Sequence, residues 1–111
     1  MYFDYLKEKT DKKVLEMPGL GFSTYSYTEL FNSDAVYIED VYVIPKLRRT
    51  RLASTMANEI YKKAKELGCE YALGSVQVDT KDATESLKVL IAHGMKLLKC
   101  EDQLIWFYKE I

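Results

Sequence analysis

The pattern of hydrophobic and polar positions predicts strands in the first half of the chain. Residues 14–17 are a short run typical of a strand, and Pro18-Gly19 follows as a turn. Residues 20–27 alternate between apolar and polar side chains, which favours a hairpin with that run. A turn is expected at residues 32–34, and residues 35–44 carry the strongest strand pattern in the chain.

The second half begins with a proline and an amphipathic helix. Pro45 ends the preceding strand because proline cannot donate to a strand ladder. Across residues 50–67 the apolar positions recur on one helical face, with charged residues largely opposite. Gly68 is suited to a left-handed helix cap. Residues 70–78, rich in Tyr, Leu and Val, are then predicted to form a strand.

The end of the chain predicts a helix followed by a hairpin. Asp82-Ala83-Thr84-Glu85 fits a capping box, and the helix continues to Gly94. Residues 96–100 and 103–109 are expected to pair as a hairpin across Glu101-Asp102. The resulting order, β-β-β-α-β-α-β-β, predicts an α/β fold with a mixed, mostly antiparallel central sheet flanked by helices.

Composition narrows the classes of function. At 111 residues, without repeats or linkers, the chain is expected to be a single domain over residues 1–111. The formal net charge of −1 gives no global signature of a nucleic-acid binder, and no apolar run is long enough to span a bilayer. The N-terminus lacks the basic-then-apolar order of a secretory signal. Cys69 and Cys100 are expected to be buried free thiols, which favours a cytoplasmic location.

A cluster of basic residues lies between the strongest strand and the longer helix. Lys46, Arg48, Arg49 and Arg51 follow Pro45 just where the helix begins. A helix N-terminus presents free backbone N–H groups that bind anions, whereas cations placed there without an anion are unfavourable. A missing anionic ligand therefore explains the cluster better than a solvated charge patch does.

Two anionic ligands fit such a cluster. Contact with nucleic-acid phosphates is one, but no base-reading motif accompanies it. A dinucleotide-type diphosphate is the other. Neither a Walker pattern nor a Gly-x-Gly-x-x-Gly fingerprint is present, which argues against nucleotide hydrolysis and redox cofactors. The loop is thus predicted to be a diphosphate site.

The segment Val41-x-Val43-x-Pro45-x-x-Arg48-Arg49-x-Arg51-Leu52-Ala53-Ser54 resembles the acetyl-CoA signature of the Gcn5-related N-acetyltransferase (GNAT) family. In that family a hydrophobic strand and a proline precede an Arg/Gln-x-x-Gly-x-Gly/Ala loop. Arg48 matches the first position of that loop and Ala53 the last. Gly94-Met95 is similar to the family's closing Gly-Phe. The resemblance covers residues 35–111 and implies a GNAT-like acyl-CoA N-acyltransferase fold.

Three features depart from the family pattern. The middle glycine of the loop is Arg51, and in the family that glycine lets the backbone approach the diphosphate. Alignment on Gly94 puts Ala83 and Leu90 where the family often has an asparagine and a tyrosine acid. Only 34 residues precede the core strand, so the chain resembles short, N-terminally trimmed members such as those carried by bacteriophages.

The resemblance implies acetyl-CoA as the cofactor and a carboxylate on the core strand as the base. Glu39 lies where some family members place a general base, and Asp40, expected on the opposite side of the sheet, is the second candidate. The alternative role of Glu39 is an ion pair with a lysine or arginine. The expected cofactor contacts are backbone N–H groups together with the charges of two arginines, and they come from Val41, Tyr42, Val43, Arg48, Arg49, Thr50, Arg51, Leu52, Ala53 and Ser54.

The implied function is N-acetyltransferase, with transfer of the acetyl group of acetyl-CoA to a primary amine such as a protein lysine or N-terminus. The alternative is a catalytically degenerate interaction module of the same fold that still holds CoA, and Arg51 and Leu90 favour it. The expected partner is an amine acceptor, which is a protein or a small molecule. Either the acceptor side is open, which suits a large substrate, or a second copy of the chain completes it in a homodimer. No membrane, nucleic-acid or metal partner is expected.

Overall fold

The computed structural model describes residues 12–79 and 83–111 and confirms the predicted order of elements. The strands are β1 (Lys13–Met17), β2 (Gly21–Leu30), β3 (Ser33–Val43), β4 (Tyr71–Gln77), β5 (Lys96–Glu101) and β6 (Leu104–Glu110). The helices are the short 3-10 turn η1 (Pro45–Leu47), α2 (Leu52–Glu66) and α3 (Ala83–Ala92). The capping box predicted at 82–85 begins at Asp82, which lies outside the described residues.

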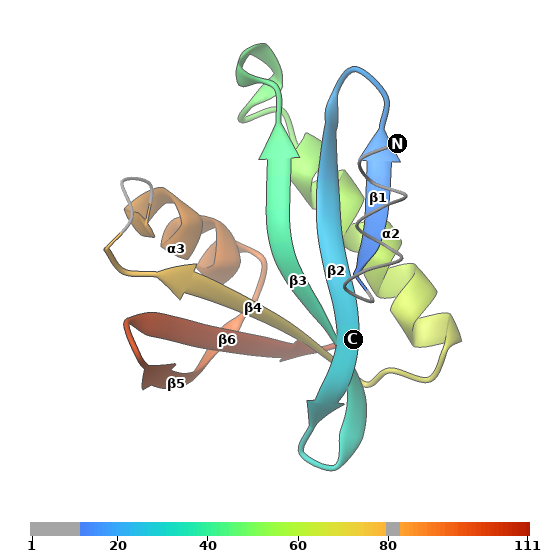
Figure 1. The fold of residues 1–111 in the computed structure, drawn as a ribbon, viewed down its shortest axis with the longest axis vertical. Coiled ribbons are helices and arrows are strands. Elements are labelled where there is room, and N and C mark those ends of the chain that lie inside the picture. The colour runs from blue at the N-terminus through green and yellow to red at the C-terminus, as the bar shows by residue number, and fades with distance from the viewer. Residues whose placement is uncertain (1–11, 80–82) are drawn as a thin grey trace.

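The six strands form one mixed sheet in the order β1-β2-β3-β4-β6-β5 (Figure 1). β3 and β4 are parallel, and the other neighbouring pairs are antiparallel. The prediction of a mixed, mostly antiparallel sheet is therefore confirmed. The parallel pair is joined through α2, as the geometry of a crossover connection requires.

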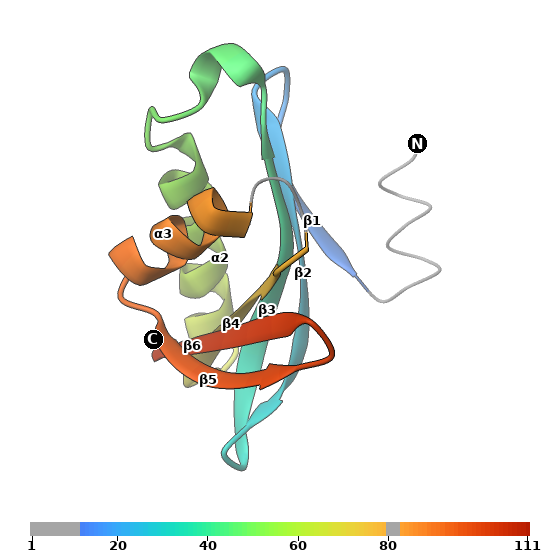
Figure 2. The same cartoon turned by 90° about the vertical axis from the view of Figure 1, so that its left-hand side faces the viewer.

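Both α-helices lie against the same face of the sheet (Figure 2). α2 buries Ile60 and Ala64, which join Val36 of β3 and Ala72 of β4 in the core. All four side chains are fully buried. Burial of a side chain the size of Ile60 contributes about 1.5–3 kcal/mol. The helical periodicity of residues 50–67 therefore reports this contact with the sheet.

β3 and β4 separate soon after they meet. Their pairing consists of Ala35–Tyr37 against Tyr71–Leu73, and beyond it the two strands diverge (Figure 1). Just past the pairing, Thr24 of β2 is opposite Asp40 while Tyr25 is opposite Ile38, so that Glu39 forms a β-bulge. A bulge bends its strand and increases the local twist. The bulge therefore helps to lead β3 away from β4 and leaves an opening between them.

Of the three hairpin turns, the one predicted at Pro18-Gly19 lies between β1 and β2 as expected, and the other two differ from the prediction by one or two residues. The turn expected at residues 32–34 is formed by Phe31 and Asn32, with φ of 53° and 62°. The turn expected at Glu101-Asp102 is formed by Asp102 and Gln103, with φ of 50° and 65°. Two-residue turns with positive φ at both positions match the twist of the flanking strands. Neither turn carries the glycine that usually marks this geometry in a sequence.

The two cysteines occupy different environments. Cys69 is 5% exposed, as expected, and packs in the core. Cys100 is exposed on β5, so the expectation that both thiols are buried is wrong for this residue. β5 is the edge strand of the sheet, and four of its six residues besides Cys100 are exposed as well. Cys100 is exposed because β5 is an edge strand and Cys100 is not among the residues that pack in the core.

Candidate functional site

The loop between η1 and α2 adopts a conformation that L-residues rarely take. Arg49 has φ of 67°, and Arg51, which immediately precedes α2, has φ of 73° and ψ of 6°. A left-handed conformation costs a non-glycine residue roughly 1–2 kcal/mol. The hydroxyl of Thr50 donates to the carbonyl of Leu47 and closes the loop. Two strained residues in one short loop indicate that its shape is imposed by its surroundings or its function.

The backbone N–H groups of this loop and of the first turn of α2 face no acceptor in the described part of the chain. The first amide to bond is that of Thr55, which donates to the carbonyl of Arg51 over 2.9 Å. No side chain caps the helix. The amides from Arg49 to Ser54 thus have no partner within residues 12–79 and 83–111. They add to the positive end of the helix dipole and form a cradle for an anion.

Arg48 ties the loop to the end of β3. Its Nε donates to the carbonyl of Val43 over 3.1 Å, and its guanidinium carbon lies 5.8 Å from the centroid of the Tyr42 ring. The Tyr42 ring in turn stacks on Phe22 with 5.6 Å between centroids. Arg48 therefore anchors the loop to β3, although its side chain is exposed, as are those of Arg49 and Arg51.

A hydrogen bond between distant residues fixes the first turn of α2. Ser54 Oγ lies 2.8 Å from His93 Nε2, just past the end of α3. The Lys109 ammonium donates to the His93 carbonyl over 3.1 Å. The Ser54–His93 hydrogen bond joins the start of α2 to the end of α3. Through the bond from Lys109, it also holds the amide cradle in place relative to β6. Ser54 was predicted only as a cofactor contact, and no local pattern links it to His93.

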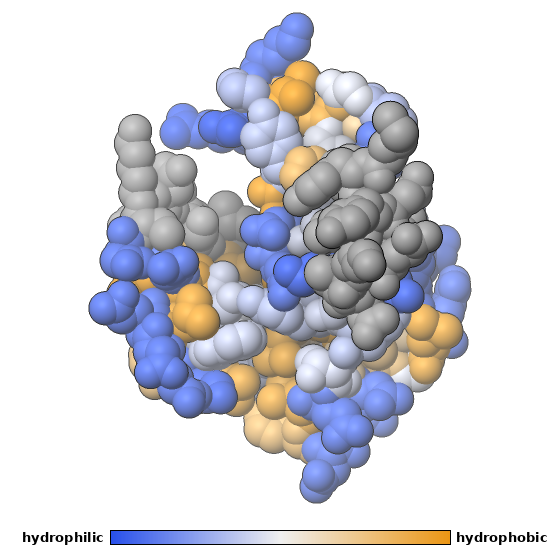
Figure 3. Space-filling model, viewed as in Figure 1, coloured by the Kyte–Doolittle hydropathy of each residue, from blue (hydrophilic) through white to orange (hydrophobic). Residues whose placement is uncertain are grey.

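The opening between β3 and β4 forms a cavity of about 390 Å³. Figure 3 shows that the molecule is hollowed below the loop that follows β3. At the base of the opening, the Tyr37 hydroxyl lies 2.7 Å from Ser75 Oγ and bridges the two strands. The cavity is lined by Lys12, Tyr37, Glu39, Asp40, Ser75, Val76, Gln77 and Leu104.

Glu39 and Asp40 both line this cavity, so the expectation that they face opposite sides of the sheet is wrong. The bulge at Glu39 interrupts the alternation of side chains on which that expectation rested. Asp40 accepts a hydrogen bond of 3.2 Å from the Thr24 hydroxyl. The two carboxylates therefore share one site instead of being separated by the sheet.

Glu39 forms an ion pair with a lysine. Its Oε2 lies 2.6 Å from Lys12 Nζ, and the Glu39 side chain is 24% exposed. Oε2 itself is buried and, apart from this ion pair, has no hydrogen-bond partner in the described residues. The hydrogen bond and charge of Glu39 raise the pKa of Lys12 above its ordinary value. The alternative role predicted for Glu39, an ion pair with a lysine or arginine, is therefore present in the structure.

The remaining predicted contacts follow one another along the chain between the cavity and the cradle. Val41 and Tyr42 are 45% and 42% exposed at the end of β3, and Val43 is buried. They lie beyond the last β3 residue that pairs with β4, so their β4 side meets no strand. Leu52 and Ala53, half-buried, begin α2. The predicted site residues thus follow the chain from the cavity, along the end of β3, to the amide cradle at the start of α2.

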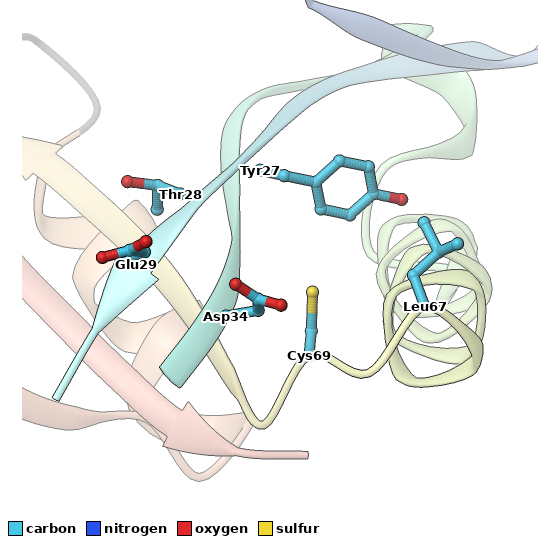
Figure 4. Close-up of a pocket in the computed structure, with 6 residues that line it drawn as sticks. All are labelled: Tyr27, Thr28, Glu29, Asp34, Leu67 and Cys69. Carbon is cyan, nitrogen blue, oxygen red and sulfur yellow. The ribbon is translucent and has the colours of Figure 1, made fainter. Parts of the chain in front are cut away.

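A second hollow, of about 360 Å³, lies near the end of β2 and the start of β3, beside the segment that follows α2. Figure 4 shows the Cys69 thiol directed into it between Tyr27, Asp34 and Leu67. Burial, and secondarily the charge of Asp34, raise the pKa of the Cys69 thiol. A protonated thiol is a poor nucleophile, so Cys69 is not expected to act as a nucleophile in this hollow.

Within 12–79 and 83–111 there is no group of three or more His, Cys, Asp or Glu side chains able to hold a metal ion. None of the described helices combines the length and apolar character that crossing a membrane requires.

The sequence model of the acetyltransferase (GNAT) family matches residues 19–90, which include the splayed strands and the amide cradle. The chain belongs to this family. No curated protein matches it.

Solved structures of GNAT acetyltransferases share its fold. An acetyltransferase from Thermus thermophilus superposes with a TM-score of 0.75 at 12% identity, covering 97% of this chain and 70% of that one. A Bacillus subtilis acetyltransferase in complex with CoA gives 0.71 at 13% identity, covering 97% and 83%. Arabidopsis thaliana NAA60 in complex with a bisubstrate analogue gives 0.68 at 15% identity, covering 83% and 65%. The chain spans 58% of a similar GNAT structure from Listeria monocytogenes.

The departures from the family signature have visible structural consequences. Arg51 occupies the glycine position with φ of 73°, the backbone region that glycine adopts without strain. Leu90, at the tyrosine position, packs against the core. Its Cδ2 lies 3.2 Å from where a Cβ on Gly74 would be, so the side chain fills space next to β4. The glycine geometry is retained without the glycine, and the tyrosine is replaced by a packing residue.

Proposed function

We propose that this chain is an acetyl-CoA-dependent N-acetyltransferase acting on a primary amine, such as a protein lysine or N-terminus. The observation that carries the proposal is the row of unpartnered amides from Arg49 to Ser54, beside the opening between β3 and β4. A cradle of amides without an internal acceptor suits a diphosphate. The complexes of its fold relatives with CoA support the choice of CoA over other diphosphates.

The end of β3 and the loop after it separate the carboxylates from the cradle. From Glu39 to Pro45 the chain covers roughly 20 Å at about 3.3 Å per residue, and the extended arm of CoA is proposed to lie along it. Arg49 and Arg51 supply exposed positive charge at the cradle, and Arg48 holds the loop on β3. When bound, acetyl-CoA supplies an acetyl group activated as a thioester.

Glu39 is the proposed general base. An amine near pH 7 is mostly protonated, because the pKa of a lysine is about 10.4. A carboxylate in contact with the amine nitrogen can remove a proton, and Glu39 already holds an ammonium at 2.6 Å. Asp40, whose carboxylate is bonded to Thr24, is the second candidate. Backbone N–H groups of residues 41–43 are proposed to stabilise negative charge on the carbonyl oxygen.

Two measurements on the full chain test this proposal. Calorimetric titration is expected to show that the unmodified chain binds CoA and that added salt weakens this binding. Changing both Arg48 and Arg51 to Ala is expected to weaken it steeply and to reduce the salt dependence, because the first residue anchors the loop and the second adds charge at the cradle. A free-thiol assay with acetyl-CoA and a panel of lysine and N-terminal peptides is then expected to show CoA release. Absence of CoA binding by the unmodified chain would refute the proposal.

The second candidate is a degenerate module that binds CoA without transferring an acetyl group. Leu90 favours it, because a packed leucine cannot donate the proton that a tyrosine acid provides. CoA binding without thiol release from any peptide would support this candidate. The thiol of CoA, with a pKa near that of cysteine at about 8.5, leaves without much help, so we expect slow turnover instead.

A further inference from the structure

A lysine of the chain itself occupies the cavity that the proposed function assigns to the acceptor. Lys12 Nζ lies 2.6 Å from Glu39 Oε2 and lines the same cavity as Tyr37 and Ser75. The amine is thus in contact with the proposed general base, at the point where β3 and β4 separate.

This contact differs from an ordinary surface ion pair. Glu39 Oε2, which pairs with the Lys12 ammonium, is buried, and among the described residues Lys12 is the partner that it has. The Lys12 side chain is 33% exposed, so most of it is covered. An exposed pair of two long side chains is held weakly, whereas Glu39 is fixed by the bulge of β3.

The neighbouring lysine provides a comparison within the same chain. Lys13 begins β1 opposite Tyr25, whose ring is in the core on the helix side of the sheet. Lys13 pairs with Tyr25 and shares its side of the sheet, whereas Lys12, just before β1, lines the cavity with Glu39. Lys13 is exposed and serves as the matched control.

We propose that Lys12 is an internal acceptor, acetylated by the same chain in which it lies. The proposal rests on the proposed acetyl transfer and adds a modification site to it. In the reaction, Glu39 takes one proton from the Lys12 ammonium and passes it to solvent. The Lys12 nitrogen forms a bond to the acetyl carbon, and the carbon–sulfur bond breaks. The second proton lost by the nitrogen goes to the sulfur, which leaves N-acetyl-lysine and free CoA thiol.

Acetylation has a direct consequence for the site. The product amide is neutral and cannot form an ion pair, so Glu39 loses its internal cation. The cavity is then open to an amine from outside the chain. Automodification at Lys12 would therefore convert a self-occupied acceptor site into a free one.

The first test is incubation of the full chain with acetyl-CoA in the absence of other amines, followed by peptide mass spectrometry. The mass of one acetyl group is expected at Lys12, with a rate constant that does not change with protein concentration. Glu39→Gln is expected to slow this modification by about a hundredfold or more, and Lys13→Arg is expected to leave it unchanged. A rate that rises with protein concentration, or equal labelling of Lys12 and Lys13, overturns the proposal.

The second test needs no coenzyme. With a limiting amount of acetic anhydride, Lys12 is expected to react more slowly than Lys13, because Glu39 holds it as an ammonium. In Glu39→Gln the two lysines are expected to react at similar rates. Equal reactivity in the parent chain would show that the amine is not at Glu39, and would overturn the proposal.

The two proposals fail in distinguishable ways. Acetylation of external peptides with Lys12 left unmodified overturns the internal acceptor and leaves the acetyltransferase function standing. Failure to bind CoA overturns both. Modification of Lys12 without turnover on any external amine supports the internal acceptor and identifies the chain as one that acetylates itself.

Discussion

Replacement of Arg51 by glycine tests the strain in the cradle. Arg51 has φ of 73°, where a residue with a Cβ pays roughly 1–2 kcal/mol. Glycine removes this strain but gains conformational freedom in the unfolded chain, which costs about 0.4–1 kcal/mol. The expected net effect is that Arg51→Gly is about 0.5–1 kcal/mol more stable than Arg51→Ala, which keeps the Cβ and also lacks the charge.

The comparison of the two variants separates strain from charge. Urea unfolding of the parent, Arg51→Gly and Arg51→Ala at equal salt measures the stabilities, and the expected difference corresponds to a Tm shift of roughly 2–8 °C. Arg49→Gly is a second case with the same sign, since Arg49 has φ of 67°. If Arg51→Gly is no more stable than Arg51→Ala, the left-handed conformation at residue 51 is not strained.

Three other predictions concern the framework of the site. His93→Ala removes the hydrogen bond to Ser54 and is expected to lower the free energy of unfolding by about 0.5–1.5 kcal/mol in urea titrations; Ser54→Ala is expected to have a similar effect, and the double variant little more than either alone. Ile60→Ala is expected to lower it by about 2–5 kcal/mol because Ile60 is fully buried, and a loss under about 1 kcal/mol in the same titration would contradict the packing of α2 on the sheet. For the Lys12–Glu39 pair, whose lysine pKa is raised in the folded chain, the stability difference between the parent and Glu39→Gln is expected to persist from neutral pH up to the ordinary lysine value of 10.5 and to shrink as the pH rises through the raised value; a difference that grows above neutral pH in denaturation measurements would contradict the ion pair.

Much of the fold could be predicted because it depends on local patterns. The periodicity of residues 50–67 predicts α2, and the buried positions of Ile60 and Ala64 confirm it. The strand predicted to end at Pro45 does end just before it in the structure. The two hairpin turns were misplaced because Phe31-Asn32 and Asp102-Gln103 adopt positive φ without glycine. Positive φ in such residues is imposed by strand pairing, which a local pattern does not contain.

The candidate site was less predictable for the same reason. The residue set from Val41 to Ser54 could be proposed from the loop and the family resemblance, and its role stays a prediction. The presence of Asp40 and Glu39 in one cavity depends on a bulge that arises from the register between β2 and β3. The contacts of Glu39 with Lys12 and of Ser54 with His93 join distant residues. Neither contact has a sequence signal.

The amide cradle can be observed directly by nuclear magnetic resonance. In a ¹⁵N-labelled chain, CoA is expected to shift the backbone amide signals of residues 49–54, whose N–H groups have no partner in the described residues. Pantetheine, which lacks the diphosphate, is expected to leave these signals nearly unchanged. If CoA binds and the amides of residues 49–54 do not move, or if pantetheine moves them equally, the loop before α2 is not a diphosphate site.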